Sequence, residues 1–484
     1  MTTYRYITTN SSSINQGTGD ITYEAQGVVI TGGIDMRYQS DDVTFNGGGN
    51  QTIYINGGVF GSLDDYWGAS SGNDRIFIGA TGYINYYWFG AIELAGGGHQ
   101  IVNNGTVSTS TYANAIYIVG SVGADLSSRD SINNTGTISG VEGVIGRTGD
   151  AVISASGTAG VDLVNSGSIM AGSGARGVSI VQGVSNYTLL ANSGLVTGGV
   201  GIAQGYITLT NTGTIEGNDN LSGAGVAVVN TGSMILTTGT NVDGLSISGA
   251  NSYLYNTGAI YDAVNDASAA VNAIKMGSLA GLYLANIGVI WVSGATNAAT
   301  EAVSFGSGAG DYLYNGATGA IYGNIAMGDG GGDYVANSGL IYGTVTLGNG
   351  AGEAYYGANG KLIGTLVCGS GGDTVYTGSD VESVTGGLGN DYILAGTGGE
   401  TILKEGVANQ GANGWDTVSN FQTVTGAPNI GTYLHLDAGM AATTNFIAYN
   451  GGTLVQMALG GGNYGYVDVL GVGVSTVKAQ TYFG

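Results

Sequence analysis

Glycines and acidic residues recur with a fixed period between Cys368 and Leu403, and together they have the composition of a calcium site. The stretch divides without a gap into four nine-residue units, each with an acid at its sixth place and an aliphatic residue at its eighth. Carboxylate and main-chain carbonyl oxygens are the ligands that calcium takes, in a cage of flexible geometry. The four acids that could supply the carboxylates are Asp373, Glu382, Asp391 and Glu400.

The third unit, residues 386–394, carries the fullest form of the pattern. It reads Gly-Gly-Leu-Gly-Asn-Asp-Tyr-Ile-Leu and matches the calcium-binding nonapeptide G-G-x-G-x-D-x-U-x at every defined position. Glycine adopts backbone angles that other residues avoid, so Gly386, Gly387 and Gly389 predict a tight turn that points main-chain carbonyls towards the next coil. We therefore expect calcium at Asp391 and this turn; the alternative is a glycine-rich turn that binds no metal.

These repeats resemble the RTX repeats of proteins that type I secretion exports. In that family, the aspartate and the glycine-turn carbonyls of neighbouring coils hold calcium in a parallel β-roll. The resemblance implies that residues 366–405 form such a calcium-binding β-roll, with Asp373, Glu382, Asp391 and Glu400 among its ligands. Glutamate at positions 382 and 400 departs from the family's usual aspartate. The resemblance also implies a secreted protein, located outside a Gram-negative bacterium or on its cell surface.

The composition of the 484 residues narrows the class of protein. There are 95 glycines but only one proline, without a Gly-X-Y period, which excludes collagen. Hydrophobic residues make up 43% of the chain, which excludes a disordered polar tail. The net charge of −23 disfavours nucleic acid and anionic membranes as partners and favours cations. Because Cys368 is the only cysteine, no disulfide can form within the chain.

A second motif, an asparagine followed by a small residue and a glycine, recurs through residues 101–365 at variable intervals. Strict and looser copies begin at Asn104, Asn134, Asn165, Asn192, Asn211, Asn230, Asn256, Asn286, Asn315, Asn337 and Asn359. A fixed motif at variable spacing is typical of a solenoid whose loops differ in length from coil to coil. Since aligned asparagines can stack as a ladder of side-chain amides, the motif predicts a β-solenoid with an asparagine column along one turn.

The asparagine repeat runs directly into the nonapeptide repeat. Acids that follow a glycine and precede a strand-like segment stand at Asp311, Asp333, Glu353 and Asp373, at intervals of 22, 20 and 20 residues. The predicted fold is therefore all-β: a parallel β-solenoid, or β-helix, that continues into an RTX-type β-roll, with β caps at both ends. The predicted parts are an aromatic-rich N-terminal cap (1–100), the solenoid (101–365), the β-roll (366–405) and a C-terminal secretion and assembly region (406–484).

Tyrosines also recur in register in the second half of the solenoid. Tyr312 and Tyr334 hold one matching place in successive repeats, and Tyr322 and Tyr342 hold another. Residues in equivalent places on neighbouring strands face the same way, so we predict stacked ladders of rings, with a sugar-binding face as the alternative.

Residues 406–484 are similar to the C-terminal region of type I secretion substrates. The segment 415–421 resembles the family's D-x-I-x-x-F sequence, and the segment 466–472 resembles its V-x-L-x-G-V sequence. The N-terminus has no basic region followed by an apolar one, and no apolar run is long enough to span a membrane. We therefore expect export through a C-terminal signal and no transmembrane segment.

The sequence is compatible with three functions. The preferred one is a secreted, calcium-stabilised structural protein that self-assembles into a surface layer, fibre or extracellular matrix, because charge is sparse and solenoid ends are stacking surfaces. The alternative is an adhesin for glycans, such as a surface polysaccharide, or for host cells; Trp67 and Trp88 would be its platform, unless these rings cover the end of the solenoid. A polysaccharide lyase or epimerase is disfavoured, because His99 and His435 are far apart and no acid–base motif accompanies them.

Overall fold

The structure, a computed structural model, describes only part of the chain. It describes residues 52–63, 73–86, 90–109, 114–119, 129–140, 151–156, 160–172, 174–183, 186–236, 243–262, 272–292, 301–357, 359–378, 382–396, 403, 414–423 and 431–484, and the main chain of 4–7, 21–23, 27–30, 34–35, 42–45, 64, 157–158, 263, 293, 400–402 and 404–405. Two compact units divide the chain. Unit 1 is Met1–Thr237 with Leu245–Gly249, and unit 2 is Thr238–Gly244 with Ala250–Gly484.

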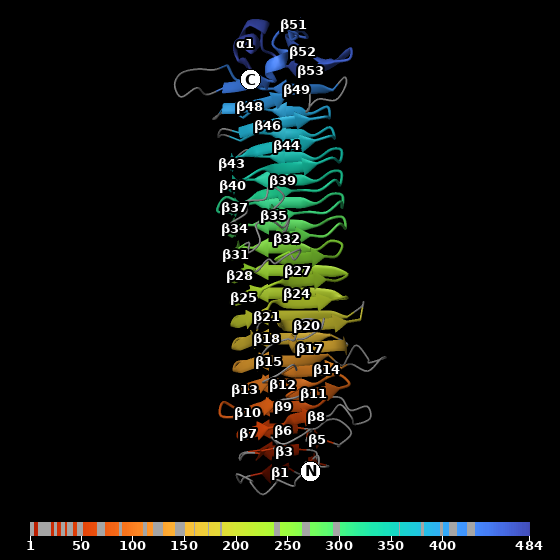
Figure 1. The fold of residues 1–484 in the computed structure, drawn as a ribbon, viewed down its shortest axis with the longest axis vertical. Coiled ribbons are helices and arrows are strands. Elements are labelled where there is room, and N and C mark those ends of the chain that lie inside the picture. Colours follow the sequence, from red (N-terminus) through yellow and green to blue (C-terminus); the bar gives the residue numbers. More distant parts are fainter. Residues whose placement is uncertain are drawn as a thin grey trace. The chain divides into compact units, whose positions relative to one another are not determined.

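Within each unit, successive coils stack their strands into parallel sheets, which we name A, B and C (Figure 1). From β3 to β43 each coil contributes to all three sheets, and the described coils before and after this range contribute to sheets A and B. The pairing is in register from coil to coil; in unit 1, for example, Tyr206↔Gly225 and Asn211↔Asn230 bound six consecutive pairs. Strands are short and alternate between buried and outward-facing residues, as Tyr206–Asn211 does. The sheets are therefore those of a parallel β-solenoid, which confirms the predicted fold class.

In unit 1 the strands fall into three sets. Sheet A contains β1 (Tyr4–Ile7), β3 (Gly27–Ile30), β6 (Thr52–Ile55), β9 (Arg75–Ile78), β12 (Gln100–Asn103), β15 (Asp130–Asn134), β18 (Val161–Asn165), β21 (Tyr187–Asn192), β24 (Tyr206–Asn211) and β27 (Gly225–Asn230). Sheet B contains β2 (Ile21–Tyr23), β5 (Asp42–Phe45), β8 (Ser62–Asp64), β11 (Ile92–Ala95), β14 (Ile116–Val119), β17 (Ala151–Thr158), β20 (Arg176–Gln182), β23 (Val200–Ala203), β26 (Asp219–Ser222) and β29 (Leu245–Ser248). Sheet C contains β4 (Ile34–Asp35), β7 (Gly58–Phe60), β10 (Tyr83–Tyr86), β13 (Thr106–Thr109), β16 (Thr137–Gly140), β19 (Ser168–Ala171), β22 (Leu195–Thr197), β25 (Thr214–Gly217) and β28 (Ser233–Leu236).

Unit 2 repeats the arrangement. Sheet A contains β30 (Tyr253–Asn256), β33 (Tyr283–Asn286), β36 (Tyr312–Asn315), β39 (Tyr334–Asn337), β42 (Ala354–Tyr356), β45 (Thr374–Tyr376), β47 (Tyr392–Leu394) and β49 (Trp415–Ser419). Sheet B contains β32 (Asn272–Met276), β35 (Glu301–Ser304), β38 (Asn324–Ala326), β41 (Val345–Gly348), β44 (Thr365–Gly369), β46 (Glu382–Gly387), β48 (Glu400–Glu405), β50 (Gly431–Leu436) and β54 (Thr481–Phe483). Sheet C contains β31 (Ala259–Ala263), β34 (Val289–Ser293), β37 (Ala320–Tyr322), β40 (Leu340–Tyr342) and β43 (Lys361–Ile363).

The last coils of unit 2 change from parallel to antiparallel pairing. Strand β49 pairs in parallel with β53 (Asn463–Val469), which continues antiparallel into β52 (Gly452–Gly460) and then β51 (Asn445–Tyr449). A short 3-10 helix, η1 (Ala438–Met440), and one α-helix, α1 (Val474–Ala479), complete the region. Strands β51 and β52 therefore lie outside the coil pattern, whereas β54 pairs in parallel with β50 in sheet B. In the described part of the chain, no helix has the length and hydrophobicity that crossing a bilayer requires.

The core of each unit consists of aliphatic side chains stacked from coil to coil. On sheet A of unit 1, Ile132, Leu163, Leu190, Leu209 and Val228 pair in consecutive strands and are fully buried. Burying such a side chain stabilises the fold by about 1.5–3 kcal/mol. Each row of the core takes one residue from every coil. Loops of different length can therefore join the strands without disturbing the core, as long as the strands keep this register.

The predicted asparagine column is present at the buried end of sheet A in both units. Each side-chain amide donates through Nδ2 to Oδ1 of the asparagine in the next coil, at 2.7–2.9 Å. Its members are Asn103, Asn134, Asn165, Asn192, Asn211 and Asn230 in unit 1, and Asn256, Asn286, Asn315 and Asn337 in unit 2. The prediction is wrong for Asn104 and Asn359, which are both exposed. The first asparagine of the column is Asn103 instead, because it is the last residue of β12 and its side chain points inward.

Two neighbouring asparagines, Asn134 and Asn133, allow a matched test of the column. Asn134 is fully buried and bonded to asparagines above and below, whereas Asn133 points outward from the same strand. We expect Asn134→Ala to lower the free energy of unfolding by about 2–4 kcal/mol, because it leaves buried polar atoms of Asn103 and Asn165 without partners. Asn133→Ala should change it by less than about 0.5 kcal/mol. Urea unfolding of both variants measures the difference, and equal effects would contradict a stabilising column.

The predicted tyrosine ladder is confirmed on sheet A of unit 2. The rings of Tyr312 and Tyr334 are stacked, with centroids 4.9 Å apart and planes 9° apart. The stack continues through Tyr283, Tyr356 and Tyr376, at centroid distances of 4.4–5.1 Å. Because the ring faces lie against one another, this ladder presents ring edges and hydroxyl groups to the solvent. Such a surface lacks the open ring faces on which sugars stack, so the ladder is primarily a packing feature of the sheet.

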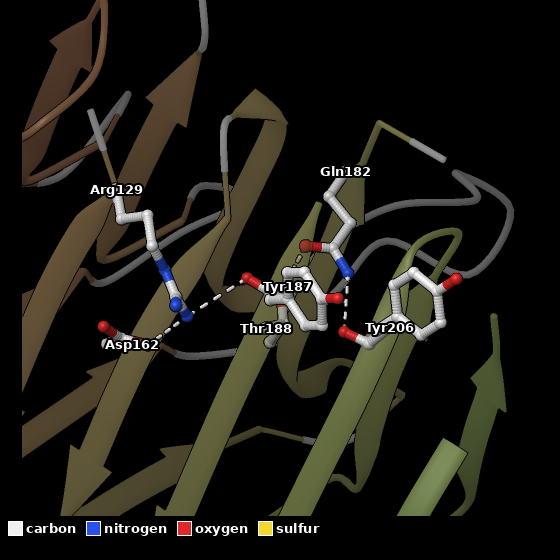
Figure 2. A network of polar contacts seen from close by, with 6 residues as sticks. All are labelled: Arg129, Asp162, Gln182, Tyr187, Thr188 and Tyr206. Atoms are coloured by element: carbon white, nitrogen blue, oxygen red, sulfur yellow. Dashed lines mark hydrogen bonds and ion pairs between the residues drawn. The ribbon is translucent and has the colours of Figure 1, made fainter. Parts of the chain in front are cut away.

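Arg129 and Asp130, which stand out as a charged pair in the sequence, face different ways. The guanidinium of Arg129 bonds the Asp162 carboxylate in the next coil and donates to the main-chain carbonyl of Tyr187 at 3.2 Å, in the coil after that (Figure 2). In the same view, Gln182 accepts a 2.7 Å hydrogen bond from Thr188. Arg129 therefore ties three coils together across the outer face of sheet A.

Candidate functional site: a buried carboxylate column

The structure brings together the two aspartates that the nonapeptide pattern singles out. Asp373 and Asp391 directly precede β45 and β47, which pair with Thr374 opposite Tyr392, so the two carboxylates lie in successive coils at the same corner. Oδ1 of Asp391 accepts a hydrogen bond from the main-chain N–H of Asp373 at 2.9 Å. Asp416, in the next coil, does the same for the N–H of Asp391, also at 2.9 Å. The structure therefore places Asp373, Asp391 and Asp416 at the same corner of three successive coils.

The same corner continues over acids that were not predicted as ligands. Oδ1 of Asp333 accepts the N–H of Asp311 at 2.8 Å, and Oδ1 of Asp373 accepts the N–H of Glu353 at 3.3 Å. We name the whole set the carboxylate column. Its members are Asp311, Asp333, Glu353, Asp373, Asp391 and Asp416. The signal for the additional members was present in the sequence, since the acids at 311, 333 and 353 continue the spacing that leads to Asp373.

Glycine turns run alongside the column and leave no room for side chains. Gly386 and Gly387 end β46, and Gly387 has a φ of +99°, which favours glycine. A Cβ on Gly389 would lie 1.5 Å from the carbonyl oxygen of Gly371 in the preceding coil and 3.1 Å from Oδ1 of Asp391. A main-chain carbonyl and a carboxylate oxygen therefore face the same small space at Gly389. Oδ1 of Asp391 also accepts the N–H of Asp373, and a second oxygen acceptor so close to it is an arrangement that a hard cation stabilises.

The carboxylates of the column are buried without full compensation. Asp373 and Asp391 are each 2% exposed, and Oδ2 of neither accepts a hydrogen bond. Burial raises the pKa of Asp373 to about 6. Burial raises the pKa of Asp391 to about 8, with repulsion from Asp416, Asp373 and Glu353 adding to it. A buried carboxylate without a partner strongly disfavours its ionised form, so a bound proton or a bound cation must neutralise this corner.

At the equivalent corner of unit 1, a histidine lies among the buried acids. His99, 1% exposed, directly precedes β12 and lies between two acids: its Nδ1 is 3.3 Å from Asp74, and its main-chain N–H donates to Asp130 at 3.0 Å. Burial alone would lower the pKa of His99, but the two carboxylates outweigh it and raise the pKa. In unit 2, no lysine, arginine or histidine is among the charges that act on five members of the column, namely Asp311, Asp333, Glu353, Asp373 and Asp391.

The ligands available at this corner fit calcium only if the main chain contributes. Over the described residues, no three acidic, histidine or cysteine side chains converge on one point. A cation here would take carboxylate oxygens from Asp373 and Asp391 and further oxygens from turn carbonyls such as that of Gly371, an all-oxygen set that suits a hard cation. The chemistry that calcium would supply is charge neutralisation, which removes the repulsion along the column.

The two predicted glutamate ligands lie apart from the column. Glu382 is buried at the start of β46; its Oε2 accepts the N–H of Gly378 at 2.6 Å, and its Oε1 is 3.4 Å from the hydroxyl of Tyr355. Tyr355 in turn receives a hydrogen bond from Asn337, the last member of the asparagine column. Glu382 therefore closes that column, and its role as a calcium ligand stays a prediction. The side chain of Glu400 lies outside the described residues, as do Trp67 and Trp88.

Asp391 and Glu382 give a paired test of these assignments. We expect Asp391→Ala to reduce the affinity for calcium at least tenfold, because it removes a carboxylate that shares the space at Gly389 with a carbonyl. Glu382→Ala should leave calcium affinity within about twofold while lowering the melting temperature, because it removes the acceptor of Tyr355 and Gly378. Calorimetric titration with calcium measures the first effect and thermal unfolding the second. Equal losses of affinity would mean that the glutamate is also a ligand.

Together the coils and the corner define a class of protein: a parallel β-solenoid whose turns carry a column of buried carboxylates. Comparison with known proteins does not narrow this class further. No protein-family model matches the chain. No curated protein is significantly similar to it.

Proposed function

We propose that this protein is an extracellular structural protein whose coils are stabilised by calcium and whose copies assemble into a surface layer, fibre or matrix. The observation that carries the proposal is the carboxylate column, with its unpartnered oxygens on Asp373 and Asp391. Calcium is scarce inside cells and abundant outside them, so a fold that needs calcium at this corner would complete itself after export.

Assembly follows from the same charge argument. The net charge of −23 keeps copies of the chain apart unless cations neutralise it. The outward residues of sheet A in unit 2 are tyrosine, alanine, threonine and leucine from β30 to β47, without a charged residue among the described ones. Copies with neutralised columns could approach through such a surface, since no long-range attraction is needed there.

The test is an electron-microscopy and sedimentation series across a calcium titration of the full chain. We expect monomers in chelator and ordered assemblies above a calcium threshold, with magnesium at the same concentration as the control, since magnesium binds flexible oxygen cages poorly. The Asp391→Asn variant should move the threshold to higher calcium. A folded monomer at every calcium concentration would overturn the structural role while leaving calcium binding intact.

Export through a C-terminal signal is part of this proposal, and it rests on the resemblance of residues 415–421 and 466–472 to type I secretion substrates. Fusing residues 406–484 to the end of a reporter that normally stays inside the cell gives a direct test. We expect the fusion in the medium only when the cells carry a type I exporter. Retention of the fusion in such cells would separate this protein from that export route.

An adhesin remains the second candidate, because one outer face of unit 2 carries accessible aromatic rings. On sheet C, Trp291, Tyr322 and Tyr342 pair in successive strands and are 40%, 37% and 55% exposed. The rings of Tyr322 and Tyr342 are 6.4 Å apart and tilted by 36°, so their faces are more open than those of the sheet A ladder. A row of open rings on a flat sheet can stack on the rings of a linear glycan.

Glycan-array binding distinguishes the two candidates. An adhesin should bind defined glycans, and Tyr342→Ala should abolish that binding without changing calcium-dependent assembly. The matched control is Tyr334→Ala, whose ring is stacked in the sheet A ladder. Absence of binding to any glycan would leave assembly as the function that the fold supports.

A further inference from the structure

Glu353 stands apart from every aspartate in the carboxylate column. The aspartates before and after it, Asp333 and Asp373, each accept a main-chain N–H from the preceding coil. Neither oxygen of Glu353 has a hydrogen bond of ordinary geometry, although the residue is 0% exposed; the polar groups that act on its carboxylate are the main-chain N–H of Gly350 and the Asp373 carboxyl group. Glu353 precedes the next acid of the column, Asp373, by 20 residues. It therefore lies before the nonapeptide stretch, which begins at Cys368.

The carboxylate of Glu353 turns into the glycine turn of its own coil. Its Oε1 lies 2.6 Å from the place that a Cβ on Gly350 would occupy, and 3.2 Å from the corresponding place on Gly348. Carbonyl oxygens from the preceding coil face the same places: that of Gly330 at 1.9 Å and that of Gly328 at 1.5 Å. Three oxygen acceptors from two coils therefore converge on one small space.

The surroundings supply negative charge and no described base. The acids that act on Glu353 are Asp373 and Asp333, and no basic side chain is among the groups that affect it. Glutamate is one methylene longer than aspartate, and this extra reach takes the carboxylate past the N–H that an aspartate would accept and into the turn. Among the described residues, the main-chain N–H of Gly350 is the one donor that acts on this carboxylate, and oxygen acceptors that converge in this way suit a cation with oxygen ligands.

We propose that Glu353 and the carbonyls of Gly328 and Gly330 form a divalent-cation site of their own, selective for calcium, in the solenoid coils before the nonapeptide stretch. The proposal rests on the calcium-binding function proposed above and extends it to a site of different composition. Cation binding would then stabilise the long coils as well as the short ones, and each kind of coil would have its own affinity.

Equilibrium dialysis of the full chain against calcium, at a pH of about 8, counts the bound ions in four proteins. These are the wild type, Glu353→Gln, Asp391→Asn and the control Asp329→Asn, which removes an exposed acid from the neighbouring turn. We expect fewer bound calcium ions per chain in Glu353→Gln and in Asp391→Asn, and the wild-type number in Asp329→Asn. Terbium luminescence should fall in parallel in Glu353→Gln, since Tyr355 lies two residues from the site and can sensitise a bound lanthanide.

The outcomes separate this inference from the function on which it rests. If Asp391→Asn loses calcium but Glu353→Gln binds the wild-type number, the Glu353 site is wrong and the calcium-stabilised column stands. If neither variant loses calcium, both are wrong. Circular dichroism of Glu353→Gln in saturating calcium establishes that the variant is folded; should it not be, Glu353→Asp, which shortens the reach into the turn, replaces it with the same expected loss.

Discussion

Removing calcium at neutral pH should loosen unit 2 far more than unit 1. In unit 2 the column holds Asp311, Asp333, Glu353, Asp373 and Asp391 without a described base, whereas in unit 1 His99 lies between its two acids. A ligand that binds only the folded state stabilises it by about 2.7 kcal/mol per site when its concentration is about 100 times Kd. Several such sites along one column would add up to a large part of the stability of a domain.

The measurement is thermal unfolding followed by circular dichroism, in calcium and in chelator, combined with hydrogen exchange to locate the loss. We expect a lower melting temperature in chelator and faster exchange in the strands β39 to β49, with little change in β9 to β27. Magnesium at equal concentration is the control for ionic strength. Identical melting curves and exchange in calcium and chelator would remove the basis for a calcium-stabilised column.

Without any cation, the stability of unit 2 should fall as the pH rises from about 4 to about 8. Burial raises the folded-state pKa of Asp311 and Asp373 to about 6 and that of Glu353 and Asp391 to about 8. Groups whose pKa is raised on folding stabilise the fold while they are protonated in it. Their contribution is complete below the unfolded-state values near 4 and is lost as the pH passes through 6 and then 8. Calcium should reverse this dependence, because it binds the ionised carboxylates.

Melting temperatures at about pH 5 and about pH 8, each in chelator and in calcium, test this prediction. We expect the chelated protein to melt at a higher temperature at pH 5, and the calcium-induced increase to be large only at pH 8. Since general charge repulsion also grows with pH, the double variant Glu353→Gln, Asp391→Asn serves as the control. Its melting temperature in chelator should depend on pH less than that of the wild type; an unchanged dependence would assign the effect to the surface.

The fold could be predicted from the sequence because its signals repeat. A single Asn-Thr-Gly is a common turn, but a series of copies fixes both the register of sheet A and the amide ladder along it. The period of a repeat also identifies the corner where Asp373 and Asp391 meet, since residues at equivalent places in successive coils lie one above the other. For the same reason, the stacking of Tyr312 and Tyr334 followed from their spacing.

Features that depend on a single side chain could not be predicted in this way. The choice between Asn103 and Asn104 depends on which of two adjacent asparagines points inward at the end of β12. Glu382 occupies the acid position of its nonapeptide, yet it reaches Tyr355 and Gly378 because it starts a strand of sheet B rather than preceding one of sheet A. Glu353 looks like an ordinary member of the series until the extra methylene directs its carboxylate into the turn.

The asparagine column has a direction, and this gives unit 2 an electrical polarity. Every amide donates towards the C-terminal coil, so the amide dipoles add, with their positive ends towards Asn337. At that end Tyr355 relays the hydrogen bond to the Glu382 carboxylate, which places a negative charge where the summed dipole is positive. Whole coils can therefore be removed from or added to the asparagine column only if the side-chain amide of its last asparagine still donates a hydrogen bond to an acceptor. A shortened solenoid engineered from this chain would need Tyr355 and Glu382, or an equivalent acid, grafted after its final asparagine.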